Sequence, residues 1–225
     1  METMVVLANS KKLGGYCVAG KALDATGHVG RWVRPVAAAA EDGLPLRSTV
    51  CSDGRQMAVL DMVAADWGPA MPALHQRENR LLGRTSLTRV GRARWGDLPA
   101  LADDASAGLW VDGHSSGCGL NDRVPLHQLP YVPGSLQLIA VPVLELRQSV
   151  GYAGRAKLRA RFRIGKQGYN LALTDTVAAS WLGQLESLSL ADAYVCVSLA
   201  VAFHDGYAYK VAAAVITKER AGGAA

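Results

Sequence analysis

The sequence lacks the cysteine pairs that mark a zinc site or a secreted disulfide scaffold. Its four cysteines are far apart and form no CxxC pair: Cys17, Cys51, Cys118 and Cys196. The five histidines are equally scattered, with no metal-ligand spacing to a cysteine or to each other. We therefore expect reduced, mostly buried thiols, no metal and no cofactor.

Long apolar runs and phosphate-binding loops are missing too. No segment approaches eighteen uninterrupted apolar residues, and the short apolar run at the start precedes its cations, which is not the order of a signal peptide. Neither a GxGxxG nor a GxxxxGK[ST] motif occurs. We expect a cytoplasmic protein without a membrane partner and without these common nucleotide-binding loops.

The composition indicates a globular protein with a modest positive charge. The 225 residues allow one large domain or two small ones, and half of them are hydrophobic, so a core can form. Twenty-four basic residues against nineteen acidic ones give a net charge of +5. This charge permits an anionic partner but does not require one.

A cationic segment with an indole dominates the first half of the chain. Asn9–Val36 contains two apolar runs that can pair as strands, and it ends on Arg31-Trp32-Val33-Arg34. Strand alternation puts Trp32 and Arg34 on one face, an arrangement that suits phosphates and bases. With Lys11 and Lys12, Arg31 and Arg34 would form a cationic surface. The alternative is a barrel strand with a core tryptophan and solvated arginines.

The segment His75–Arg94 is also basic. It contains six arginines and one acid, Glu78, with leucines interleaved. An anion-binding face and an ordinary solvated face are both compatible with this pattern.

The second half has the element order of an OB-fold, a five-stranded barrel. We expect three strands, a helix and two strands, at residues 136–146, 155–164, 169–173, 176–185, 193–202 and 207–217. The first half has similar strand patterns with longer insertions. The fold class predicted is all-β, with two OB-like barrels at residues 1–130 and 135–218 and a flexible tail at 219–225.

The strand at 155–164 alternates cations with apolar residues. Its predicted cationic face consists of Arg155, Lys157, Arg159, Arg161 and Arg163. Successive members would be about 6.6 Å apart, close to the phosphate spacing of a single strand. The alternative is a solvated strand face. For stacking on bases, the candidates are Trp32, Trp110 and Tyr169.

A polar loop, Leu109–Pro125, gives a set of pocket candidates: Ser115, Asn121, Asp122 and Arg123. Asp122 could orient Arg123 toward a phosphate or a base edge, or the loop could bond to itself.

Three further pocket candidates lie near the C-terminus. Thr174 and Asp175 either cap a helix or help its amides bind an anion. Lys210 lies opposite Tyr207 and Tyr209 on the last strand, which form either a stacking platform or an amphipathic edge.

Six segments resemble a bacterial family, the dual OB-containing domain. They are NSKKLGGYCVAGK (Asn9–Lys21), GRWVRPV (Gly30–Val36), HQRENRLL (His75–Leu82), LWVDGHSSGCGLNDRVP (Leu109–Pro125), YNLALTD (Tyr169–Asp175) and VSLAVAFHDGYAYKVAAAVI (Val197–Ile216). The resemblance implies two OB barrels, a nucleic-acid- or nucleotide-binding role and a place in bacterial conflict systems.

The chain departs from the family pattern twice. Thr176 stands where a proline follows the threonine-aspartate pair, and Ala200-Val201-Ala202-Phe203 stands where the family has Glu-Pro-Phe. Because the glutamate is missing, these departures weaken an enzymatic reading and leave a binding one intact.

Three hypotheses about function follow. The first is a binder of nucleic acid, with single strands favoured over duplex, or of a nucleotide. The second is an enzyme acting on a nucleotide or nucleic acid, with His114 or Asp122 as acid–base group and Arg123 as anion clamp. The third is an interaction module for another protein of the same operon.

Overall fold

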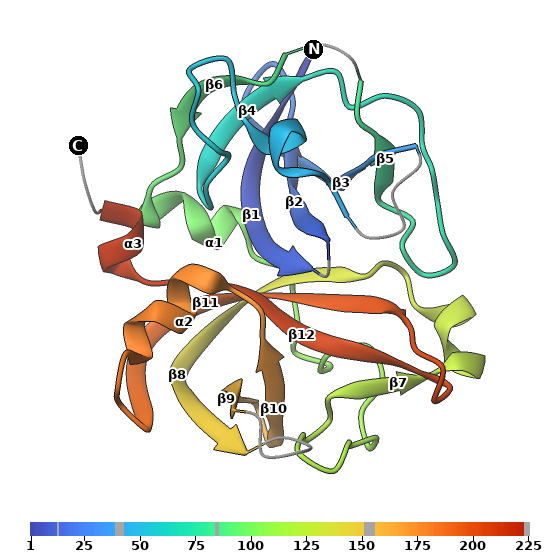
Figure 1. The fold of residues 1–225 in the computed structure, drawn as a ribbon, viewed down its shortest axis with the longest axis vertical. Coiled ribbons are helices and arrows are strands. Elements are labelled where there is room, and N and C mark those ends of the chain that lie inside the picture. The colour runs from blue at the N-terminus through green and yellow to red at the C-terminus, as the bar shows by residue number, and fades with distance from the viewer. Residues whose placement is uncertain (13, 39–42, 84–85, 151–155, 223–225) are drawn as a thin grey trace.

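The computed structural model describes residues 1–12, 14–38, 43–83, 86–150 and 156–222, and it confirms the predicted all-β class. The strands form two six-stranded sheets, which lie one above the other (Figure 1). The first sheet contains β1 (Glu2–Lys12), β2 (Gly15–Leu23), β3 (Val29–Val36), β4 (Asp61–Ala65), β5 (Asn79–Leu81) and β6 (Thr88–Arg92). The second contains β7 (Arg123–Pro125), β8 (Leu136–Val150), β9 (Ala156–Ile164), β10 (Gln167–Leu173), β11 (Ser187–Ala202) and β12 (Tyr207–Ile216).

The helices are short. They are the 3-10 helices η1 (Leu46–Thr49), η2 (Trp95–Asp97) and η3 (Leu126–Tyr131) and the α-helices α1 (Leu98–Leu101), α2 (Thr176–Leu182) and α3 (Lys218–Gly222). In the described part of the chain, none is long and apolar enough to cross a membrane.

The second sheet is a closed five-stranded barrel with β7 added at its edge. Strands β10, β9, β8, β11 and β12 pair in that order, and a parallel β10–β12 pairing closes the ring. Along the chain, β8, β9 and β10 precede α2, and β11 and β12 follow it. The predicted order of three strands, a helix and two strands is therefore confirmed.

The first sheet repeats this arrangement with its last strand divided. Strand β3 pairs in parallel with β5, and β4 pairs antiparallel with β6. Together β5 and β6 take the place that β12 takes in the second barrel. The short helix η1 lies between the third and fourth strands, where the second barrel has α2. This divided strand is the physical reason why the first half showed the OB pattern only faintly.

A shared core joins the two barrels. Leu7 of β1, Leu138 of β8 and Ile216 of β12 are fully buried in one apolar cluster. Burying one such side chain stabilises a protein by about 1.5–3 kcal/mol. The alanines of β12, Ala213 and Ala214, lie in the same cluster, where their small side chains let the sheets approach. The expected boundary near residues 130–135 stays a prediction, and β7, which precedes it, pairs with β12.

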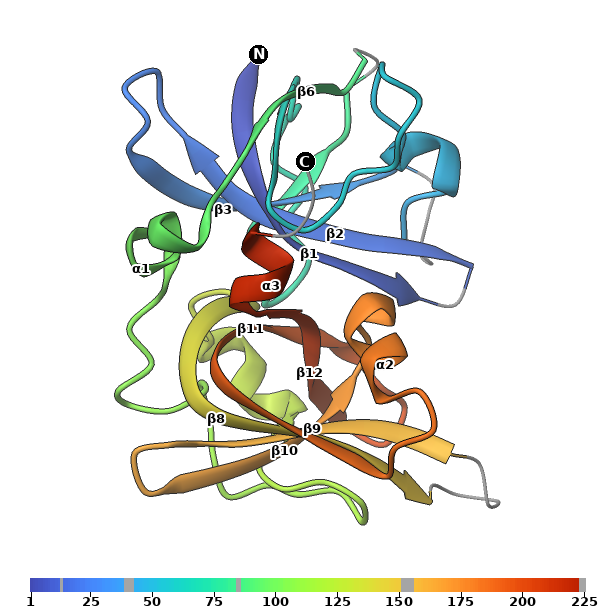
Figure 2. The same cartoon turned by 90° about the vertical axis from the view of Figure 1, so that its left-hand side faces the viewer.

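Part of the predicted flexible tail is the helix α3, which lies between the two sheets (Figure 2). The Arg220 guanidinium donates to Asp175 at 2.5 Å, and the Arg220 carbonyl accepts from Arg92 at 3.0 Å. Because Arg92 belongs to the first sheet and Asp175 caps α2, Arg220 connects the barrels. Residues 219–222 of the predicted tail belong to this helix, and residues 223–225 lie outside the described part.

Candidate nucleic-acid interface

Strand β9 presents a row of exposed cations, because its apolar residues face the barrel interior. Ala160 and Phe162 are buried in the barrel core, whereas Lys157, Arg161 and Arg163 are exposed. The Arg161 guanidinium is 3.9 Å from the Glu145 carboxylate on β8, which is beyond hydrogen-bond distance. These three cations are therefore accessible to a ligand. Arg155, the first member of the predicted row, lies outside the described residues.

Arg159 corrects the prediction of a continuous cationic face. Its side chain is buried, and its Nη2 lies 3.2 Å from the Asp122 carboxylate and also donates to the Asn170 carbonyl. The buried acid comes from the polar loop, far from β9 in the sequence. The exposed row is therefore interrupted in its middle.

The polar loop bonds to itself and to the barrel. Asp122 accepts hydrogen bonds from the backbone and hydroxyl of Ser116, at 2.7 and 2.6 Å. A Cβ atom at Gly119 would clash with this carboxylate, so glycine is required there. The predicted orientation of Arg123 by Asp122 is wrong, because Asp122 pairs with Arg159 instead.

Asn121 also has a structural role in the loop. It adopts a left-handed conformation with φ 49°, which asparagine tolerates well. Its side chain accepts from the Gly113 amide at 2.7 Å and donates to the Gly168 carbonyl at 2.9 Å, while its backbone amide donates to the Ser115 hydroxyl at 3.0 Å. The backbone of Leu120 bridges to Asn170 of β10. The loop thus forms part of the barrel wall.

Residues Gly113–Gly117 match GxSxG, a motif of serine nucleophiles that sequence reasoning missed. In that motif the serine sits on a sharp turn between a strand and a helix. Here the segment lies in a loop that leads to strand β7, and Ser115 accepts from the Asn121 amide. The structural context of a nucleophile is therefore not met.

The β11–β12 hairpin provides accessible aromatic rings. Phe203 is 57% exposed, and its ring contacts that of Tyr209 edge-on at 6.4 Å. The Tyr209 hydroxyl donates to Asp205 at 2.5 Å, and burial together with this carboxylate raises its pKa. The Arg123 guanidinium lies 4.0 Å over the Tyr207 ring, a cation–π contact. Because Arg123 covers one face of Tyr207 and both tyrosines are half-buried, a stacking platform and an amphipathic edge both stay predictions for this pair.

A groove connects the hairpin with β9. Its volume is about 620 Å³, and Lys157, Phe203 and Tyr209 are among the residues that line it, together with Lys210 at its floor. OB barrels bind oligonucleotides on the face of their second and third strands and on the loop between the fourth and fifth. In this barrel those elements are β9, β10 and the hairpin loop. The groove therefore lies where an OB barrel holds its ligand.

The aromatic residues predicted to stack on bases are packed instead. Tyr169 is fully buried, stacks on Phe162 and donates its hydroxyl to Asp112 at 2.7 Å. Burial and this carboxylate raise its pKa. Trp32 donates its Nε1 hydrogen to Asp103 at 3.2 Å, and Trp110 packs against the second barrel's core. Sequence reasoning missed Phe203, although its place beside the His204–Gly206 turn signalled exposure.

The Lys210 side chain is buried rather than exposed on the strand surface. Its Nζ donates to the Val111 carbonyl at 2.6 Å and lies 3.0 Å from Asp112. Burial lowers its pKa, and the Asp112 carboxylate opposes that shift. The Lys210 ammonium thus anchors the start of the polar loop onto β12.

Thr174 and Asp175 have structural contacts in this fold. Asp175 is fully buried and caps α2 by accepting from the amides of Val177 and Ala178 at 3.0 and 3.2 Å. The Thr174 hydroxyl donates to the Ala212 carbonyl at 3.3 Å. The geometry therefore favours capping over anion binding.

The cations predicted for the first barrel do not form one surface. Lys11 is exposed, Arg31 pairs with Glu2 at 2.8 Å, and Arg34 is buried with its Nη1 3.2 Å from Glu78. For Lys12, at the end of β1, only the backbone is described.

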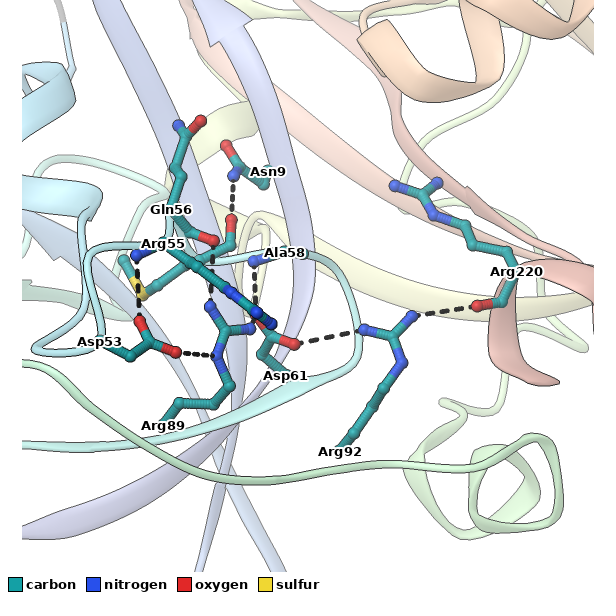
Figure 3. Close-up of polar contacts among 10 residues, drawn as sticks. Asn9, Asp53, Arg55, Gln56, Ala58, Asp61, Arg89, Arg92 and Arg220 are labelled. Carbon is teal, nitrogen blue, oxygen red and sulfur yellow. Dashed lines mark hydrogen bonds and ion pairs between the residues drawn. The ribbon is translucent and has the colours of Figure 1, made fainter. Parts of the chain in front are cut away.

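Acids also neutralise part of the basic segment His75–Arg94 (Figure 3). Arg89 pairs with Asp53 at 3.0 Å and with the buried Asp61, and Arg92 pairs with Asp61 at 3.2 Å. This segment therefore stabilises the first barrel in part. Among the residues that the structure describes, no cluster of histidine, cysteine or acidic side chains could hold a metal ion.

Comparison with known proteins gives one match. No curated protein and no solved structure matches the chain. A family model described as the dual OB-containing domain matches residues 2–215, nearly the whole chain. The two repeated strand orders described above are those expected of two OB folds. The chain therefore belongs to the dual OB-containing domain family.

Proposed function

We propose that the protein binds single-stranded nucleic acid across the outer face of its second barrel. The observation that carries this proposal is the groove lined by an exposed cation, Lys157, and by two rings of the hairpin, the exposed Phe203 and the half-buried Tyr209. Cations along a backbone and rings for the bases are the two parts of a single-strand binding site. Duplex DNA would not offer its bases to these rings.

The dimensions of β9 fit a short oligonucleotide. A strand rises about 3.3 Å per residue, so Lys157 and Arg163 are about 20 Å apart, or roughly three phosphate steps. Arg161 and Arg163 would hold the backbone beyond the groove, and Phe203 would stack on a base. Membership of the family supports, as part of the same proposal, a cytoplasmic bacterial protein with a role in defence.

The test is a fluorescence anisotropy titration with labelled single-stranded DNA, single-stranded RNA and duplex DNA. The wild type should bind a single strand more tightly than the duplex. The double variant Arg161→Glu/Arg163→Glu should weaken that binding about tenfold or more, because two phosphate contacts become repulsive.

A matched control reverses two exposed arginines of the first barrel, Arg47→Glu/Arg55→Glu, with the same change in net charge. This control should bind like the wild type. Equal binding of single strands and duplex, or equal losses in both double variants, would contradict the proposal.

A further inference from the structure

A second cavity lies between the two barrels. Its volume is about 390 Å³, within the range of small-molecule sites. The first barrel contributes Lys11, Tyr16, Arg34 and Asn79, and the second contributes Thr174 and Ser198. The cavity is therefore complete only when both barrels are present.

Arg34 is a buried cation whose hydrogen bonds are incomplete. It is 3% exposed, and its Nη2 donates to the Ser198 hydroxyl at 3.1 Å. Its Nη1 lies 3.2 Å from Glu78 without hydrogen-bond geometry, and neither Nε nor Nη1 has an acceptor among the described residues. Leaving buried donors without acceptors is unfavourable, above all on a charged group, so a ligand that supplied acceptors would be stabilised here.

Asn79 leaves an acceptor unused at the same place. It is 5% exposed, its Nδ2 donates to the Gln76 side chain at 3.4 Å, and its Oδ1 has no donor among the described residues. Both amides line the cavity. The complementary ligand therefore carries a hydrogen-bond donor as well as acceptors.

The rest of the lining defines the body and charge of the ligand. Two lining residues are cations, Lys11 and Arg34, and no lining residue is acidic; the acid nearest Arg34, Glu78, lies outside the lining. The Tyr16 side chain and aliphatic groups, among them Pro35 and Val211, form the remaining wall. This wall suits a flat or apolar body with an anionic group.

We propose that the cavity between the barrels binds a small anion of mononucleotide size. Its anionic group would face Lys11 and Arg34, and a ring amine would donate to Asn79. Asparagine and glutamine side chains commonly recognise such base edges. The site is distinct from the groove on β9, and binding of a free nucleotide there does not depend on the proposed function.

The six segments that resemble the dual OB-containing domain also point to this cavity. Five of the six contribute lining residues, and the segment that does not is the polar loop Leu109–Pro125. The cavity and the β9 groove are lined by neighbouring residues of the same strands. Leu173 and Lys210 line the groove, and the residues that follow them, Thr174 and Val211, line the cavity. The ligand is therefore either a free nucleotide or the terminal nucleotide of a bound strand.

The test is calorimetric titration of the full chain with the four ribonucleoside monophosphates, their nucleosides and inorganic phosphate. At least one monophosphate should bind, and Val201→Trp, which fills the cavity mouth, should weaken it at least tenfold. Val201 is 49% exposed, so the fold should tolerate the change. The matched control is Leu126→Trp, also at a 49% exposed position but in η3 and away from the lining.

A second variant and a competition arm complete the design. Lys11→Glu should weaken the monophosphate but not its nucleoside, and Arg161→Glu/Arg163→Glu should leave monophosphate binding unchanged. In the competition arm, a 5′-phosphorylated oligonucleotide is added to the wild type with bound monophosphate. If the oligonucleotide displaces the monophosphate, and if this competition is lost in Val201→Trp, the terminal nucleotide is the ligand of this same site. No binding of any monophosphate, or binding that survives both Val201→Trp and Lys11→Glu, would overturn the proposal.

Discussion

The two barrels share a strand order but differ in the contacts that their arginines make. In the first barrel, Arg89 and Arg92 pair with the buried Asp61, and Arg34 lies inside beside Glu78. In the second, β9 exposes Lys157, Arg161 and Arg163, and Lys157 lines a groove together with Phe203 and Tyr209. A run of basic residues therefore does not locate a binding surface; the placement of acids from distant parts of the chain does.

The barrels also differ in closure, because the β10–β12 pairing closes the second, whereas no pairing of β5 with β6 closes the first among the described residues. The second has a continuous last strand and a helix, α2, capped by the buried Asp175. The first divides its last strand and has, at the place of α2, the 3-10 helix η1, which follows Pro45 and lacks a side-chain cap. We infer that the second barrel is the more strongly specified unit, and the following predictions test this comparison.

The largest effect is expected from Asp175→Ala. The change removes a helix cap and leaves the Arg220 guanidinium, 10% exposed, without its buried partner. The free energy of unfolding in urea should fall by about 3–5 kcal/mol. Pro45→Ala, at the equivalent place in the first barrel, should cost about 1 kcal/mol or less. Similar losses in both variants would remove this difference between the barrels.

A smaller effect is expected from Phe203→Ala on nucleic-acid binding. Loss of one stacking ring should cost about 1–3 kcal/mol of binding free energy, measured by anisotropy with a single-stranded oligonucleotide. The control, Leu46→Ala, alters a side chain of similar exposure (53% against 57%) in the first barrel and should have no effect. If both variants bound like the wild type, the hairpin would not be a stacking platform.

The smallest effect concerns pH at the junction of the barrels. His75 is 1% exposed, and its Nε2 lies 2.9 Å from the Ala200 carbonyl of β11. Burial lowers its pKa below the ordinary 6.5 and Arg34 acts in the same direction, whereas the hydrogen bonds to the Ala200 and Leu199 carbonyls and the Glu78 carboxylate oppose the shift. Below about pH 6.5 the unfolded chain therefore binds a proton that the folded chain does not, and stability falls as the pH falls toward the folded pKa.

The slope from this one group is at most about 1.4 kcal/mol per pH unit. Urea unfolding of the wild type and of His75→Gln between pH 7.5 and 5.5 should show a stability difference that changes with pH. A difference that stayed constant over this range would contradict the account of His75.

Alternation made much of the second barrel predictable from sequence. A period of two over β9 identified the strand and its inner face, and the Thr174-Asp175 pair identified the start of α2. The burial of Arg159 was not predictable, because its partner Asp122 is 37 residues away and its cover is an irregular loop. Tyr169 was misjudged for a related reason, since alternation does not show which face of a strand is buried in the barrel.

The cavity between the barrels was out of reach for the same kind of reason. It needs the register of two sheets that meet through a shared core, and no local pattern encodes that contact. Arg34 was recognised as important, but as a surface cation rather than as part of a buried wall. Its partner Glu78 is the one acid of the basic segment His75–Arg94. That isolated acid was the sequence signal that one arginine is paired in the interior.

The most direct test of the central claim is the salt dependence of single-strand binding. We would measure log Kd against log salt concentration for the wild type, for Arg161→Glu/Arg163→Glu and for Arg47→Glu/Arg55→Glu. Loss of two phosphate contacts should reduce the slope by about 1.4 in the second-barrel variant and leave it unchanged in the first-barrel variant. Equal slopes in all three proteins, or a reduction confined to the first-barrel variant, would contradict binding on the second barrel.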